Sequence, residues 1–299
     1  MDDSAVAEWT ISSEPLSATL TRRGAFIRSL RHGDREILSS FEPGTTPIMM
    51  DGAQLLPWPG RIANGRYDWQ GTVQELPITE PERHNAIHGL AHRLDWELVD
   101  HSTDRLALGV HLEPQPGWPG DVRVSLTATL DERTLTIVVE VENVGAEEIP
   151  FGYGAHPYVR LGGAPRAEWE VEAPFADVLL VDHDRLLPLE LGRVDDPGNP
   201  LPDLRIRQHL GHTHLDHAFT APGEHPWKVR VSHQDMAVTI SSPDMDWVQL
   251  YTPKDASLLA IEPMSVGADA FNGGPGAKGL RHLAPGQRTD FSWSLTVEG

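Results

Sequence analysis

Residues 122–141, VRVSLTATLDERTLTIVVEV, contain the pattern that decides the fold. In 122–130 apolar side chains recur at every second position, and 135–141 is rich in β-branched residues. Alternation with a period of two is typical of a half-buried β-strand, and β-branched side chains favour a pleated, extended backbone. The polar residues DER at 131–133 have the composition of a turn, so this stretch predicts an antiparallel β-hairpin.

Outward from this hairpin, further short segments have the composition of strands: 25–30, 106–112, 178–181, 229–231, 237–240, 247–251, 258–261 and 291–297. The 27 glycines and 25 prolines fall between such segments at short intervals, as turn residues do. The gaps lack the amphipathic helices of ~10–15 residues that parallel sheets need. The sequence therefore predicts an all-β protein, a large antiparallel β-sandwich with few short helices. Because no repeat or linker divides the chain, we expect residues 1–299 to form one domain.

Charge and composition exclude several classes of function. The chain has 44 acidic residues against 24 Lys and Arg, a formal net charge of -20 at pH 7. Such a surface repels phosphate backbones and anionic lipid, so we expect neither nucleic acid nor a membrane as a partner. The absence of Cys excludes disulfides, thiolate nucleophiles and Cys-ligated metals. The first residues, MDDSAVAEW, are acidic where a secretory signal is basic, and no apolar run approaches the ~18 residues of a membrane span, so we expect a cytoplasmic location.

Fifteen histidines raise the question of a metal site. Residues 84–92, HNAIHGLAH, space three histidines by four, which places imidazoles on one face only in a helix. Asn85, Gly89 and the preceding Pro81 favour a loop instead. Residues 211–217, GHTHLDH, contain three histidines, His212, His214 and His217, and a short loop could bring two of them and Asp216 onto one ion. Without a second obvious carboxylate we interpret this segment as a polar loop. We therefore expect no metal ligands.

Other motifs are missing or weak. The chain has neither GxxxxGK[ST] nor GxSxG, and we expect the glycine-rich FNGGPGAKG at 271–279 to be a flexible loop. Flat aromatic faces beside polar groups suit sugar rings, although we expect most of these tryptophans to serve packing. Those that stand beside Pro, Gly or Asp are Trp58, Trp69, Trp96, Trp118 and Trp247.

Five segments carry a more specific signal: GRIANGRY (60–67), HNAIHGLAHRLDW (84–96), GWPGDV (117–122), GAHPYVRLGG (154–163) and IEPMSVGADAFN (261–272). With LDHAF (215–219) and VQLYTP (248–253), they resemble the aldose 1-epimerase (galactose mutarotase) family in order and over nearly the whole chain. The resemblance implies a galactose mutarotase-like supersandwich with the sugar site in a cleft on one sheet. It also implies His156 as general acid and Glu262 as general base, with sugar hydroxyls held by Arg61, His88, Asp216 and Gln249.

The reaction itself requires an acid and a base. Interconversion of α and β anomers removes a proton from the C1 hydroxyl and delivers one to the ring oxygen, after which C1 rotates and the ring closes on its other face. A carboxylate and an imidazolium suffice, so no cofactor is expected. At ordinary pKa values Glu262 is ionised near neutral pH, and we expect a nearby carboxylate to keep His156, with an unperturbed pKa of ~6.5, charged.

The substrate is less defined than the reaction. Gly60 stands where many family members have Asn, and 263–272 lacks the Pro that more commonly precedes the Asp. We expect a free hexose or related aldose, acted on by a monomer or homodimer. A rival enzyme is a hexose-6-phosphate 1-epimerase, in which the phosphate would need cations from among Arg66, Arg83, Arg93 and Arg160. Two rivals come from different functional classes: a non-catalytic sugar sensor, which retention of both His156 and Glu262 disfavours, and a metal-dependent hydrolase built on the histidine clusters.

Overall fold

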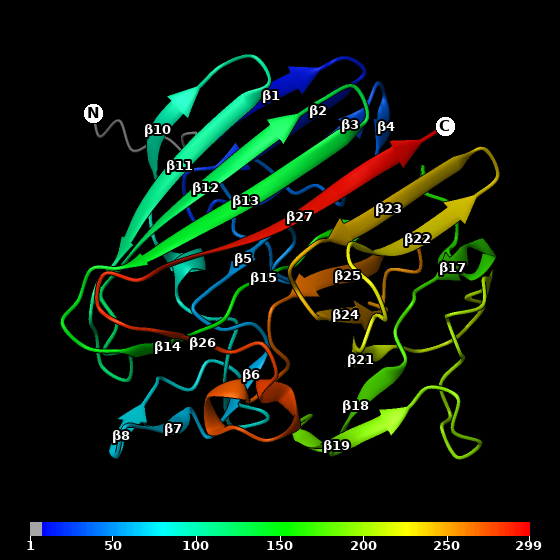
Figure 1. The fold of residues 1–299 in the computed structure, drawn as a ribbon. Coiled ribbons are helices and arrows are strands. Elements are labelled where there is room, and N and C mark those ends of the chain that lie inside the picture. Colours follow the sequence, from blue (N-terminus) through cyan, green and yellow to red (C-terminus); the bar gives the residue numbers. More distant parts are fainter. Residues whose placement is uncertain (1–7) are drawn as a thin grey trace.

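The computed structural model describes residues 8–299, which form two large β-sheets, a smaller four-stranded sheet and three two-stranded ribbons (Figure 1). Every strand pair is antiparallel. Across the nine-stranded sheet the order is β10 (Glu97–His101), β11 (Arg105–Leu112), β12 (Val122–Leu130), β13 (Thr134–Asn143), β27 (Arg288–Glu298), β23 (Met236–Ser242), β22 (Trp227–His233), β17 (Glu170–Glu172) and β20 (Gln208–His209).

The eight-stranded sheet lies below it in Figure 1. Its order is β19 (Pro188–Arg193), β18 (Asp177–Val181), β21 (Asp216–Thr220), β24 (Trp247–Tyr251), β25 (Leu259–Met264), β15 (Gly154–Ala155) and β5 (Gln54–Leu55), and β16 (Tyr158–Val159) also pairs with β25. The four-stranded sheet contains β1 (Glu8–Ser13), β2 (Leu16–Thr21), β3 (Ile27–His32) and β4 (Arg35–Glu36). The ribbons are β6 (Arg61–Ala63) with β9 (Asn85–Ile87), β7 (Arg66–Trp69) with β8 (Thr72–Glu75), and β14 (Ile149–Phe151) with β26 (Arg281–Leu283).

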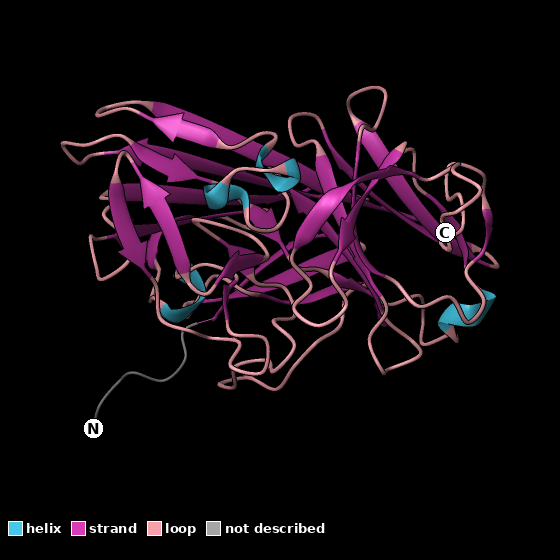
Figure 2. Cartoon of the chain, turned by 90° about the horizontal axis from the view of Figure 1, so that it is seen from below, coloured by secondary structure: helices cyan, strands magenta, loops and turns pink. Residues whose placement is uncertain are grey.

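Helical structure in residues 8–299 is limited to four 3-10 turns of three residues each (Figure 2). They are η1 (Ala91–Arg93), η2 (Arg166–Glu168), η3 (Ala270–Asn272) and η4 (Pro275–Ala277). None of these described helices has the length and apolar character needed to cross a bilayer. The predicted all-β class with few short helices is thus confirmed.

The alternation in residues 122–141 becomes the two faces of the nine-stranded sheet. Leu126 on β12 and Ile137 on β13 are fully buried. On each strand the buried positions alternate with positions that are partly or wholly exposed. The buried face packs against β1 and β2 along β11 and β12, and against β25 along β23. One apolar cluster continues through these contacts from Ile11 on β1 to Val297 on β27, so the sheets enclose a shared core.

The predicted strands overlap observed ones, and 247–251 coincides with β24. The predicted hairpin is confirmed, with Leu130 opposite Leu135 at its turn. Sequence analysis missed several strands. Among them are β10 and β19, which are the outermost strands of their sheets and are exposed at most positions. Because little of an outer strand is buried there, nothing imposes apolar alternation on it.

Two expectations about irregular segments need correction. Residues 271–279 are not simply a flexible loop but form parts of η3 and η4, with Phe271 and Gly276 buried. A Cβ atom on Gly276 would lie 2.1 Å from the Ala268 carbonyl oxygen, so glycine is what lets this turn pack so closely. In 84–92 the expected loop contains the short strand β9, bounded by His84 and His88, which both have positive φ.

Candidate active site

The eight-stranded sheet presents polar side chains on the face turned away from the core. On β24 and β25, Leu250 and Ile261 belong to the core cluster, and strand alternation therefore turns Gln249 and Glu262 to the opposite face. Gln249 stands directly opposite Glu262 in the register, and Asp216 of β21 stands opposite Tyr251. Three adjacent strands of the sheet thus bring these four side chains to one surface.

Loops bring the remaining predicted residues to this surface. His156 directly follows β15; its N–H donates to the Ala53 carbonyl (3.0 Å), and its carbonyl accepts from the Gly52 N–H (2.9 Å). Arg61 begins β6, and His88 follows the partner strand β9, with Arg61 opposite Ile87 in the register. The His88 N–H donates to the Gly60 carbonyl at 2.9 Å, which continues this ladder by one pair and fixes His88 beside Arg61.

A cavity of ≈ 200 Å³ lies where these elements meet. Its lining contains all six predicted site residues, which are Arg61, His88, His156, Asp216, Gln249 and Glu262. The five other lining residues are Gly60, Arg83, Tyr251, Met264 and Ala268. Tyr251 was missed by sequence reasoning, although it lies two residues after Gln249 on a predicted strand and therefore shares its face. Tyr251 is the aromatic side chain of the lining that could offer a flat face to a sugar ring.

The five tryptophans that the sequence analysis named do not offer a face to the cavity. Trp58, Trp96, Trp118 and Trp247 are almost completely buried, and neither these four nor Trp69 line the cavity. Trp247 donates its indole N–H to the Lys278 carbonyl at 2.9 Å, and Trp69 donates to the Glu148 carbonyl at 2.7 Å. They are therefore packing residues, as we expected for most of them.

His156 and Glu262 form a contacting pair within the cavity. His156 Nε2 lies 3.3 Å from Glu262 Oε1, and the two residues are only 5% and 3% exposed. Burial raises the pKa of Glu262 well above its ordinary value, and the negative charge of Asp216 raises it further. Burial likewise lowers the pKa of His156, to about 4. This corrects the expectation of an ionised Glu262 beside a charged His156, because burial favours a neutral pair that holds one proton.

His88 is also held in its neutral form. Its Nδ1 accepts the Gly60 N–H at 3.3 Å, so its ring proton lies on Nε2. Burial lowers the pKa of His88 well below its ordinary value, and repulsion from a protonated His156 and from Arg61 would lower that pKa further. The His88 ring meets the His156 ring at 80°, with 5.4 Å between centroids. His88 can therefore donate a hydrogen bond from Nε2 without being charged.

Two further contacts orient polar groups of the lining. Gln249 donates from Nε2 to Asp216 Oδ1 at 2.7 Å, which fixes the amide. Among residues 8–299 the amide oxygen of Gln249 has no hydrogen-bond donor, so it can accept from a ligand. Arg61 donates from Nε to Glu80 Oε2 and from Nη2 to Glu80 Oε1, each at 3.0 Å. The lining thus contains both donors and acceptors, as recognition of sugar hydroxyls requires.

Glu80 is a residue that sequence analysis missed. Burial alone would raise its pKa, but hydrogen bonds from Arg61 and Asn85 and the charges of Arg61 and Arg83 hold that pKa below its ordinary value. Glu80 lies in the segment TEPER (79–83), whose acidic residues look alike in sequence. Glu80 is 7% exposed, whereas the side chain of Glu82 is 67% exposed, so only three-dimensional contacts distinguish them.

The histidine clusters do not converge. Within residues 8–299, no three His, Asp or Glu side chains are grouped as metal ligands would be. His84 is exposed and contacts Asn64 Oδ1 at 3.3 Å, while His88 lines the cavity. In 211–217, His214 lies 3.1 Å from Thr252 Oγ1, and Asp216 turns into the cavity. Neither segment therefore groups its histidines as metal ligands would be grouped.

Of the four arginines near the motifs that could have held a phosphate, only Arg83 lines the cavity. Arg66 is exposed and lies outside the lining, Arg93 donates to His92 Nε2 at 3.0 Å, and Arg160 pairs with Glu36 at 3.5 Å. Arg83 itself donates to Glu80 Oε1 at 3.0 Å. Its charge is therefore already partly compensated.

Gly60 and Ala268 form the least bulky part of the lining. Gly60 has φ +65°, and a Cβ atom built on it would lie 3.4 Å from the Cβ atom of Ala268. Both positions belong to the two segments that differ from the commoner family pattern. Small residues at both positions leave this side of the cavity open.

Solved structures of other proteins share this architecture. The GalM/aldose epimerase homologue of Caenorhabditis elegans aligns with a TM-score of 0.86 and 20% identity, covering 98% of this chain and 99% of that one. Galactose 1-epimerase of Lactobacillus acidophilus aligns with a TM-score of 0.82 and 17% identity, covering 100% and 96%. At such identities the likeness concerns the fold, and it confirms the predicted class, a galactose mutarotase-like supersandwich.

The sequence extends this likeness from fold to family. The profile of the family described as aldose 1-epimerase matches residues 8–296, and the chain belongs to this family. The Escherichia coli protein named uncharacterized protein YihR is 31% identical over 263 residues, covering 86% of this chain and 83% of YihR. The E. coli protein named uncharacterized protein YphB is 28% identical over 305 residues, covering 91% and 99%. Family membership supports a general aldose epimerase function.

Proposed function

We propose that this protein is a cofactor-independent aldose 1-epimerase that interconverts the α and β anomers of a free hexose or related aldose. The observation that carries the proposal is the buried contact between His156 Nε2 and Glu262 Oε1 in a polar cavity. A carboxyl and an imidazole in contact supply the two proton-transfer groups that ring opening needs. The other polar residues of the lining, among them Arg61, His88 and Gln249, suit the hydroxyls of a sugar.

The proposed cycle uses one proton on the pair. In ring opening Glu262 accepts the proton of the C1 hydroxyl and His156 donates its proton to the ring oxygen, so the pair's proton ends on Glu262. C1 then rotates about its bond to C2. In ring closure His156 takes the proton back from the former ring oxygen, and Glu262 returns a proton to the oxygen on C1. The 3.3 Å contact lets the proton pass directly between Oε1 and Nε2, so a free site with the proton on Glu262 can enter the cycle.

Arg61, His88, Asp216 and Gln249 are proposed to hold the substrate through its hydroxyl groups. Arg61 and the neutral His88 donate, Asp216 accepts, and the free carbonyl oxygen of Gln249 accepts as well. No step of this mechanism requires a metal ion or an organic cofactor. One domain over residues 1–299, a cytoplasmic location and a monomeric or homodimeric state belong to the same proposal.

A hexose-6-phosphate 1-epimerase is the second candidate, because Arg83 lines the cavity and a guanidinium can bind phosphate through two charge-assisted hydrogen bonds. Its hydrogen bond to Glu80 and its 3.9 Å ion pair with Glu82 weaken this candidate. A sugar sensor without activity would have no need for a buried acid–base pair, which disfavours that third possibility.

A panel of freshly dissolved single-anomer sugars, followed by polarimetry or NMR with and without the protein, tests the proposal. We expect faster equilibration of at least one free sugar. His156→Ala and Glu262→Ala should each lose on the order of 10²–10⁴-fold in rate while remaining folded by circular dichroism. If no sugar equilibrates faster with the protein, the enzymatic proposal fails. A near wild-type rate in either variant would remove that residue from the mechanism.

A further inference from the structure

We propose that Glu80 is a positioning residue that sets the orientation of Arg61 toward the sugar; this inference rests on the function proposed above. Glu80 does not line the cavity itself. Its carboxylate accepts hydrogen bonds from Nε and Nη2 of Arg61, from Arg83 Nη1 and from Asn85 Nδ2, and the shortest contact of each nitrogen is 3.0 Å. A single buried carboxylate thus fixes two guanidinium groups at the edge of the cavity.

The contact with Arg61 defines which part of that side chain meets a ligand. Because Nε and Nη2 of Arg61 face Glu80, Nη1 is the nitrogen for which no partner occurs within the described residues. Two parallel hydrogen bonds fix both the position and the plane of a guanidinium. An arginine held in this way needs little further ordering when a ligand arrives, and such preorganisation strengthens binding.

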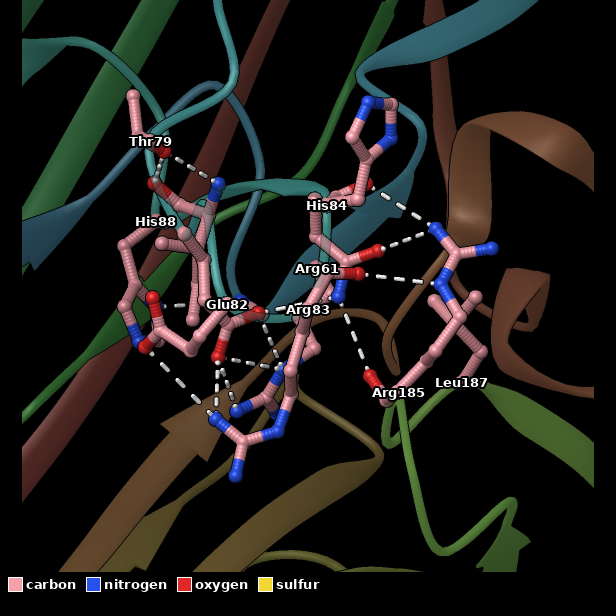
Figure 3. Close-up of polar contacts among 12 residues, drawn as sticks. Arg61, Thr79, Glu82, Arg83, His84, His88, Arg185 and Leu187 are labelled. Atoms are coloured by element: carbon pink, nitrogen blue, oxygen red, sulfur yellow. Dashed lines mark hydrogen bonds and ion pairs between the residues drawn. The ribbon is translucent and has the colours of Figure 1, made fainter.

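Glu80 is itself held by a second segment of the chain. Asn85 donates from Nδ2 to Glu80 Oε2 and also to the Arg185 carbonyl at 3.1 Å, and it accepts from Arg185 Nη2 at 3.0 Å. Arg185 also donates to the carbonyls of Arg83 and His84, each at 3.0 Å (Figure 3). Hydrogen bonds from Arg185, in the turn before β19, therefore hold residues 83–85 in place next to Glu80. The resulting chain of contacts runs from Arg185 through Asn85 and Glu80 to Arg61.

Glu80→Gln tests the proposal, with Glu82→Gln as the matched control. Both substitutions remove one carboxylate from the same short segment, but Glu82 is exposed, and within residues 8–299 its ion pair is with Arg83 and not with Arg61. We expect Glu80→Gln to raise KM for the best sugar of the panel by about 10- to 100-fold, the effect of a lost charge-assisted hydrogen bond. Since Arg61 would bind ground state and transition state alike, kcat should change less than about threefold. Glu82→Gln should leave both constants unchanged.

A double-mutant cycle separates positioning from a general structural role. If Glu80 acts through Arg61, Glu80→Gln should raise KM less than about twofold in an Arg61→Ala background. An equal effect of Glu80→Gln in both backgrounds, or a fall in kcat with KM unchanged, would overturn the proposal. If Glu80→Gln does not fold, Glu80→Asp takes its place, because it keeps the charge but withdraws it from Arg61. Failure of both variants to fold would show that Glu80 is structural and would also overturn the proposal.

The wild-type protein distinguishes this inference from the proposed function. If it accelerates anomer exchange but the cycle is additive, only the positioning role fails. If it binds D-glucose or D-galactose in an NMR titration without accelerating exchange, the enzymatic function fails, and dissociation constants replace KM in the same cycle. If it neither binds nor converts any sugar of the panel, both proposals fail.

Discussion

Glu262→Gln should separate catalysis from stability at this site. Glutamine keeps the shape of a protonated glutamate but cannot accept the proton of the C1 hydroxyl. We therefore expect a loss of about 10²–10⁴-fold in kcat/KM, which corresponds to about 3–5 kcal/mol of transition-state stabilisation. Because burial raises the pKa of Glu262, the folded wild-type protein already holds this side chain in a neutral form that glutamine imitates.

The free energy of unfolding should report this burial through its pH dependence. A raised pKa in the folded state means that the stabilising contribution of protonated Glu262 is fully present below its unfolded pKa of ~4.3 and is lost as the pH rises toward the folded pKa. In that window wild-type stability should fall by about 1.4 kcal/mol per pH unit relative to the glutamine variant. The two proteins should therefore be similar near pH 4.5, and the variant should be the more stable at pH 7.

Urea unfolding of both proteins between pH 4.5 and 7.5, with NMR exchange rates on the same samples, measures both effects. The conservative Glu224→Gln, a change at an exposed carboxylate outside the cavity lining, is the control and should show neither effect. A pH-independent difference in stability would mean that Glu262 is ionised in the folded protein and would refute the argument from burial. Activity within tenfold of wild type would refute its role as base.

Three further outcomes are expected. Because burial lowers the pKa of His156 to about 4, a second proton reaches the pair only near pH 4. The acid limb of kcat/KM should therefore lie near pH 4, and an acid limb near 6.5 would contradict this burial. Free hexoses should have higher kcat/KM than their 6-phosphates, and Arg66→Ala and Arg160→Ala should not change that preference; a 6-phosphate preference that disappears in Arg83→Ala would favour the phosphate epimerase. Dialysis against a strong chelator should leave the rate unchanged, and a loss restored by zinc or manganese would contradict the side-chain mechanism.

Much of the fold could be predicted from the sequence, because a strand that is buried on one face has apolar residues at every second position. This held for β12, β13 and β24, whereas the exposed outer strands β10 and β19 carry no such pattern. The six residues implied by family resemblance lie in one cavity, because the motifs that carry them form the loops and strands that meet around it. Their protonation was not accessible in this way, because it depends on the burial of Glu262 and His156 by residues distant in sequence. Glu80 was missed for the same reason.

The place of β27 in the nine-stranded sheet has a consequence for how this protein is made. β27 forms hydrogen-bonded ladders with β13 on one side and β23 on the other, yet every other strand of that sheet precedes it in sequence. On the ribosome, β13 is complete at residue 143, while β27 begins at residue 288. At translation rates of ~5–20 residues per second the edge of β13 waits on the order of 10 s for its partner. A nascent chain stalled in that interval exposes unpaired strand edges through which it can associate with other chains.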